Sequence, residues 1–257
     1  MATEVVTGES LQALAEELRP VVEHLVTEDD TPVDNLFSEK QMRLLTEPLY
    51  SSWAGPGGAP ACGSRPFVAM AHVGLFYHIR RPPLVPDVLL SLDVEVPADV
   101  HLKHNRSYFV WEYGKPPDVV IEIVSNREGG EDSDKLATYA RIPIRYYVIY
   151  DPDQLLSNET IRVWELGATG FHKLDGPIWF PDAGLGLRIW QGRYETLNAN
   201  WLRWVDAMGE LVPTGRELAE AEHERAEVER IRAEAERQRA DALVEQLRQH
   251  GIEPLRQ

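Results

Sequence analysis

The sequence has little cysteine, no long apolar run and no excess of positive charge. Cys62 is the only cysteine among 257 residues, which excludes an internal disulfide framework and favours a reducing compartment. We expect its thiol to be inert. No apolar run approaches the ~20 residues of a membrane-spanning helix, and the N-terminus lacks the basic start and apolar core of a signal peptide. We therefore expect a soluble, cytoplasmic protein without a membrane partner.

The charge balance is acidic. The chain has 42 Asp and Glu residues against 26 Lys and Arg residues, a net charge of -16. Binding to a phosphate backbone depends on clustered Lys and Arg, so this balance disfavours non-specific nucleic-acid binding. The last 44 residues contain eight Arg but eleven acids, so the tail is not a basic arm. Nucleic acid would have to bind in a locally basic groove.

Hydrophobic patterning divides the chain into three parts. Residues 1–35 are predicted to form a short helix and an acidic linker, residues 36–209 one α/β domain, and residues 210–257 a charged helical tail. In the second part, Ser38 and Gln41 have the spacing of a capping box, and Pro48 should end that helix near Glu47. A further helix should follow Asp134 and end before Pro143.

Strand-like segments fill most of the second part. The residue types predict strands at 66–77, 87–92, 118–124 and 146–150, a hairpin over 160–166 and 170–174, an edge strand at 184–190 and a helix at 196–208. We expect His72 to be a core histidine bonded to a backbone carbonyl. The fold class is therefore α/β, with a mixed central sheet flanked by helices and a long C-terminal helix.

The tail is rich in Ala, Glu and Arg. From Thr214 to His250 it should form one helix of roughly 35 residues, about 50 Å long at ~1.5 Å per residue. Its apolar residues do not keep a strict heptad, and Glu and Arg three and four apart can stabilise it in solution. We expect a solvated, partly self-associating helix rather than a tight coiled coil, and a homo-oligomer, most simply a dimer.

Acidic residues at or within apolar strands are candidates for chemistry. Asp87 opens one strand, and Glu122 lies inside the most β-branched one. Burying a carboxylate there costs several kcal/mol unless it is paired or bound to a cation. Two readings follow: a metal-dependent cluster, or a salt bridge from Glu122 to Lys135 or Arg141. Lys135 and Tyr139 lie four residues apart and share a helix face.

Four blocks together resemble the Uma-two family of restriction-endonuclease-like proteins, in the PD-(D/E)xK nuclease superfamily. They are Val85–Val88, Pro116–Ser125, Lys135–Tyr139 and Tyr146–Pro152. The resemblance covers about residues 36–209 and the tail, and implies that Asp87 and Glu122 bind Mg2+ (or Mn2+). The usual lysine would fall at Val124, so Lys135 would take its place.

Other residues could complete such a site. Asp118 and Tyr139 are additional candidates, and so is an acid from the helix after Ser38, either Glu39 or Glu47. Nothing in the sequence chooses between Glu39 and Glu47.

Two functions of different classes therefore stay open. The first is a magnesium-dependent DNA endonuclease with Asp87, Glu122 and Lys135 as catalytic residues. The second is a non-catalytic interaction protein on a decayed nuclease fold, which would use its acidic surface and long helix to recruit a protein partner. The sequence gives neither the target sequence nor the choice between DNA and RNA.

Overall fold

A computed structural model describes residues 8–27, 35–53, 55–56, 65–127 and 130–249, and Cys62 lies outside these ranges. The chain divides into two compact units, Met1–Val212 and Pro213–Gln257, which are described separately. In the described ranges, no helix has the length and apolarity needed to cross a membrane.

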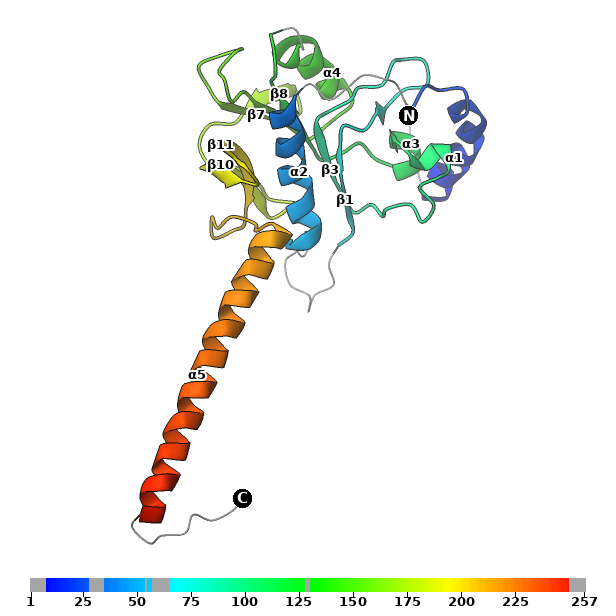
Figure 1. Ribbon diagram of the computed structural model, residues 1–257. Coiled ribbons are helices and arrows are strands. Elements are labelled where there is room, and N and C mark those ends of the chain that lie inside the picture. The colour runs from blue at the N-terminus through cyan, green and yellow to red at the C-terminus, as the bar shows by residue number, and fades with distance from the viewer. Residues whose placement is uncertain (1–7, 28–34, 54, 57–64, 128–129, 250–257) are drawn as a thin grey trace. The chain divides into compact units, whose positions relative to one another are not determined.

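A six-stranded mixed sheet forms the centre of the first unit (Figure 1). Its strands, in spatial order, are β1 (Phe67–Ala71), β3 (Val88–Leu92), β5 (Val119–Ile123), β6 (Tyr146–Tyr150), β7 (Ile161–Gly167) and β8 (Gly170–Lys173). Among the described strands of this sheet, only the neighbours β5 and β6 run parallel, and every other neighbouring pair is antiparallel. Every residue of β3, β5 and β6 is buried, as the continuous apolar runs indicate. The predicted α/β class with a mixed sheet is confirmed.

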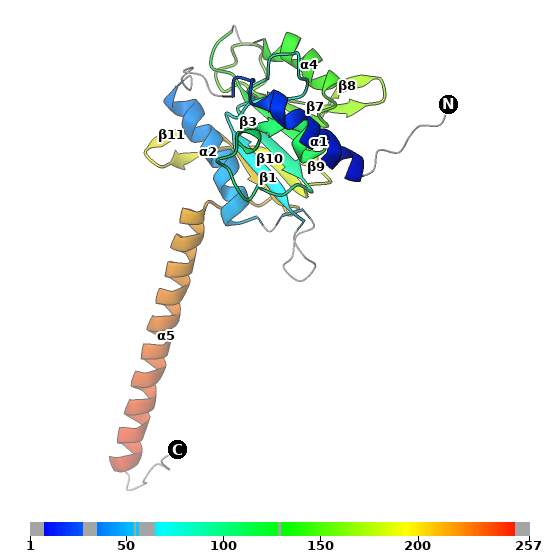
Figure 2. The ribbon, with the colours of Figure 1, turned by 90° about the vertical axis from the view of Figure 1, so that its right-hand side faces the viewer.

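One face of this sheet packs against α2 (Leu36–Ser51) and a second, antiparallel sheet. The strands of the second sheet are β9 (Ile178–Phe180), β10 (Leu185–Tyr194) and β11 (Leu197–Val205). Gln41 joins α2 to β11, because its side chain donates to Leu202 O at 2.8 Å and accepts from Leu202 N at 2.9 Å. Figures 1 and 2 both show α2 alongside β11.

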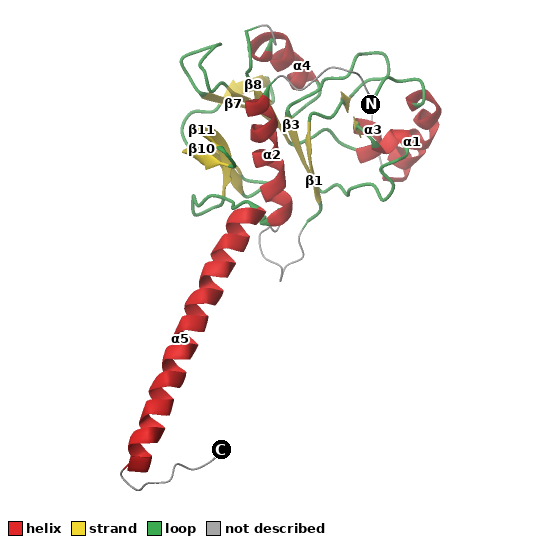
Figure 3. Cartoon of the chain, in the orientation of Figure 1, coloured by secondary structure: helices red, strands yellow, loops and turns green. Residues whose placement is uncertain are grey.

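The opposite face is covered by short helices and a two-stranded sheet (Figure 3). A π-helical turn, η3 (Glu131–Lys135), leads into α4 (Leu136–Arg141), and β2 (Leu75–Phe76) pairs with β4 (Tyr108–Phe109). A 3-10 turn, η2 (Lys103–Asn105), precedes β4. α1 (Gly8–Val22) packs on α3 (Val110–Tyr113) through the buried cluster Val22, Phe76, Phe109 and Trp111.

The helix predicted at 196–208 is wrong, because this segment is the strand β11. Glu195, at φ +50°, makes the turn of a hairpin in which Tyr194 pairs with Leu197. All five residues from Trp201 to Val205 are buried, so polar and apolar residues do not alternate there. The spacing of Trp201, Trp204 and Val205 therefore imitates a helix. β10 is a central strand of its sheet, not an edge.

The expected ends of α2 and the expected burial of His72 are also wrong. Asn35 caps α2 by accepting from Ser38 N at 2.9 Å, and the helix continues through the buried Pro48 to Ser51. The preference against helix before proline is overridden here by packing of Pro48 in the interior. His72 is exposed at φ +53°, where β1 ends.

The second unit contains one helix, α5 (Gly215–Gln249), as the tail composition predicts. It begins with a capping box in which Thr214 N donates to Glu217 Oε2 at 2.8 Å and Glu217 N donates to Thr214 Oγ1 at 3.1 Å. Val228, Ile231 and Leu243 are exposed.

Candidate active site

Glu122 is the buried centre of the site. It lies in β5 with an exposed fraction of 1%, on the face opposite to Ile121 and Ile123. Two side chains from the helical cover reach it: Tyr139 donates to Oε1 at 2.6 Å, and Lys135 Nζ lies 2.9 Å from Oε2. Both carboxylate oxygens thus have a partner, as a buried carboxylate requires.

Asp87 lies beside Glu122. Val88 pairs with Ile121, so the same antiparallel register carried one residue further sets Asp87 opposite Glu122. Asp87 Oδ2 accepts from Ile123 N at 2.6 Å, which ties its carboxylate to the end of β5. Adjacent strands therefore hold the two acids together, as the sequence predicts.

Lys135 connects Glu122 to a third acid. Its Nζ also lies 3.4 Å from Glu131 Oε1, one turn earlier in η3. The other oxygen, Glu131 Oε2, is buried and has no hydrogen-bond partner. Glu122 and Glu131 therefore share one ammonium group, which is also close enough to interact with the charge of Asp87, and a buried oxygen of Glu131 remains to accept a further donor or cation.

The electrostatics of the cluster follow from its burial. Burial raises the pKa of Glu122 to about 7, opposed by Lys135 and Tyr139 and reinforced by the charge of Asp87. Burial alone would lower the pKa of Lys135, but Glu122, Glu131 and Asp87 outweigh it and raise that pKa. Burial and then Glu122 raise the pKa of Tyr139 well above its ordinary value, so its hydroxyl stays a neutral donor.

The structure does not bring the other predicted acids to this point. Asp118 precedes the opposite end of β5, where it accepts from Leu92 N at 2.8 Å and pairs with Lys115. Glu39 Oε1 lies 3.3 Å from Arg43 Nη1 in an ion pair, and Glu47 is exposed. Both belong to α2, which packs on the other face of the sheet.

Three residues near the cluster were not singled out from the sequence. Besides Glu131, they are Tyr147, whose hydroxyl donates to Glu131 O at 2.8 Å, and Arg162, which lies 3.5 Å from Asp132. Both side chains hold η3 against the sheet. The spacing of Glu131 and Lys135, four residues apart and so on one helix face, could have indicated their pairing.

The donors at this site suit a hard cation. Mg2+ is usually held by one or two carboxylates together with water, and Asp87 and Glu122 supply that number, with Glu131 adjacent. Among the residues that the structure describes, no three His, Cys, Asp or Glu side chains already surround one point. A cation here would therefore keep several water ligands, and the absence of Cys and His disfavours zinc.

One family model matches part of the chain. A family model described as "Uma2: Putative restriction endonuclease" matches residues 61–175. This span contains Asp87, Glu122 and Lys135, and the resemblance seen in the sequence is confirmed. A search of curated proteins gives no match.

One solved structure, from Anabaena variabilis, is described as a "putative nuclease". It shares 14% sequence identity, and the match covers 60% of this chain and 75% of that chain. The TM-score is 0.38.

Proposed function

We propose that the first unit is a magnesium-dependent DNA endonuclease that hydrolyses phosphodiester bonds. The observation that carries the proposal is the convergence of Asp87, Glu122 and Lys135, which come from three separate segments, on one end of the sheet. The description of the family whose model matches residues 61–175, "Putative restriction endonuclease", supports the same reaction class.

Each residue has a role that its contacts allow. Asp87 and Glu122 would hold the cation, which when bound supplies an activated water and offsets phosphate charge. Tyr139 orients Glu122 through the 2.6 Å hydrogen bond. Lys135 holds a positive charge beside the carboxylates, where it can neutralise the phosphate or position the attacking water.

Plasmid cleavage tests this proposal. Wild-type protein should nick supercoiled plasmid with Mg2+ or Mn2+ and not with EDTA, Glu122→Gln should abolish cleavage, and Lys135→Ala should lower turnover more than metal binding. Asp134→Asn, which neutralises an exposed acid in the same turn, is the matched control and should cleave normally. A wild-type chain that leaves plasmid intact with both metals would refute the proposal, as would undiminished cleavage by Glu122→Gln.

The exposed apolar residues of α5 support a second candidate function, that of an interaction protein. Val228, Ile231 and Leu243 have exposed fractions of 65%, 56% and 58%, and the chain carries a net charge of -16. In this alternative, α5 recruits a protein partner and the carboxylate cluster has lost its catalytic activity. Inactivity of the full chain on DNA, with a partner bound through residues 213–257, would favour it.

A further inference from the structure

The acidic chain has two adjoining hollows whose linings, among the residues that the structure describes, include no carboxylate. One hollow, of about 370 Å³, is lined by His78, Arg81 and Arg141 together with apolar residues and Thr138. The next, of about 610 Å³, shares Tyr77, His78 and Val110 with the first and adds Arg80 together with apolar residues that include Leu14, Leu18 and Trp111. We call the two together the basic groove. Its linings contain no Asp or Glu among the described residues.

The cations of the basic groove are available to a ligand. Arg80, Arg81 and Arg141 are exposed, and no ion pair involves them within the described part of the chain. A local turn fixes the first two, because His78 Nδ1 accepts from Arg80 N at 3.0 Å and His78 O accepts from Arg81 N at 3.2 Å. Three unpaired guanidinium groups in a chain of net charge -16 form a local positive surface.

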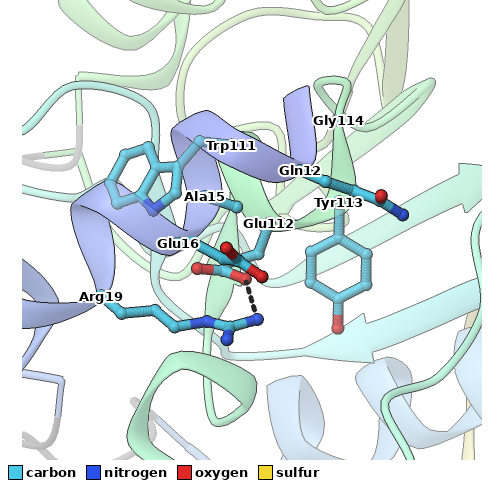
Figure 4. A pocket seen from close by; sticks show the side chains of 8 residues that line it. All are labelled: Gln12, Ala15, Glu16, Arg19, Trp111, Glu112, Tyr113 and Gly114. Atoms are coloured by element: carbon cyan, nitrogen blue, oxygen red, sulfur yellow. Dashed lines mark ion pairs between the residues drawn. The ribbon is translucent and has the colours of Figure 1, made fainter. Parts of the chain in front are cut away.

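A third hollow provides the contrast. The pocket between α1 and α3, about 480 Å³, is lined by Glu16 and Glu112, and Arg19 lies 3.9 Å from Glu112 (Figure 4). Its two acids face one cation that is already paired. Such a pocket repels phosphate, whereas the basic groove attracts it.

One helical segment, residues 131–141, contributes side chains both to the basic groove and to the carboxylate cluster. Tyr139 and Lys135 lie on one face of the helical segment and contact Glu122, while Thr138 and Arg141 line the groove from another face. From Lys135 to Arg141 the rise is about 9 Å at ~1.5 Å per residue, a length that spans roughly three nucleotides of a strand. Arg81 lies on the segment that leads into Asp87.

We infer that the basic groove binds the phosphodiester backbone of a nucleic acid and guides it to the carboxylate cluster. The inference rests on the proposed function, because it assigns the substrate contacts of that site. It also resolves the conflict between acidic composition and an anionic substrate, since phosphate is held where the cations are locally in excess.

Fluorescence anisotropy tests the groove without cleavage. The full chain is titrated onto a fluorescein-labelled 20-base-pair duplex in EDTA at 50 to 200 mM salt. The logarithm of the affinity falls linearly with the logarithm of the salt concentration, and each lost phosphate contact should make this slope less steep by ~0.9. The Arg81→Gln, Arg141→Gln double variant should therefore bind more weakly, and wild-type affinity should fall about tenfold more than the variant's over this salt range.

The controls separate charge loss from misfolding. Arg193→Gln removes an exposed arginine of β10 outside the groove and should bind as wild type. Arg141→Lys keeps the charge and should retain most binding. Absence of duplex binding by the wild type, an unchanged salt slope in the double variant, or equal competition by polyglutamate would overturn the inference. If duplex binding depends on salt and on the arginines as expected but the wild-type chain does not cleave, only the proposed endonuclease activity would be refuted, and the inference about the basic groove would stand.

Discussion

Ionisation of Glu122 should make the metal-free protein less stable as pH rises. Its pKa moves from an ordinary value of 4.5 to about 7, mainly through burial. At ~1.36 kcal/mol for each tenfold change in proton affinity, this rise in the pKa of Glu122 corresponds to roughly 3 kcal/mol. Because the folded state binds the proton more tightly than the unfolded state, this stability is fully present below pH 4.5 and is lost as pH rises through 7.

The substitution Glu122→Gln isolates this contribution. Glutamine keeps an oxygen for Tyr139 but has no proton to lose, so the variant should lack the part of the pH dependence that Glu122 contributes. The free energy of unfolding should fall between pH 4.5 and 8 by roughly 3 kcal/mol more in the wild type than in the variant. The comparison is a difference of pH profiles, so titrations shared by both proteins cancel.

Urea unfolding in EDTA at pH 4.5, 6, 7 and 8 measures both profiles. Tryptophan fluorescence follows the first unit alone, because all seven Trp residues precede Pro213. Glu95→Gln, at an exposed acid, is the control and should run parallel to the wild type. Parallel profiles for wild type and Glu122→Gln would show that the carboxyl is not held in a desolvated state and would refute its raised pKa.

Three further predictions concern the site and the tail. Tyr139→Phe leaves Glu122 Oε1 without its hydrogen-bond donor, so the free energy of unfolding should fall by about 1–3 kcal/mol and cleavage should be lost. Urea titration and the plasmid assay measure the two effects. Unchanged stability would contradict the hydrogen bond. Glu131→Gln should weaken Mn2+ binding by calorimetry, whereas Asp134→Asn should not; equal affinities would remove Glu131 from the site. Truncation at Pro213 should leave tryptophan fluorescence native and lower the oligomeric mass in light scattering, and an unfolded product or an unchanged mass would contradict a separable, self-associating helix.

Local pattern was enough to predict the strands that build the site. β5 and β6 are short runs of β-branched or aromatic residues bounded by polar residues, a pattern that favours a buried strand over a helix or a loop. Their residue types therefore indicate both structure and burial. The meeting of Asp87 and Glu122 follows once two such strands are neighbours.

Tertiary contacts decided what the sequence could not. β11 is buried on both sides at its end, which removes the alternation that marks a strand. α2 continues through Pro48 because the proline ring packs in the interior, and the residues around Pro48 in the sequence do not indicate this packing. Glu131 gained its place through Lys135 and through the bond from Tyr147 to its carbonyl, and such contacts depend on the sheet order.

The two faces of β5 make the register of that strand indispensable. Val119, Ile121 and Ile123 pack in one core, while Val120 and Glu122 lie on the face of the carboxylate cluster. Because side chains alternate with a period of two, insertion or deletion of one residue within β5 would exchange the faces. The glutamate would enter an apolar core and an isoleucine would stand beside Asp87. Insertion or deletion of one residue in this five-residue strand would thus destabilise the protein and disrupt the carboxylate cluster at the same time, whereas length changes in the flanking loops would preserve both.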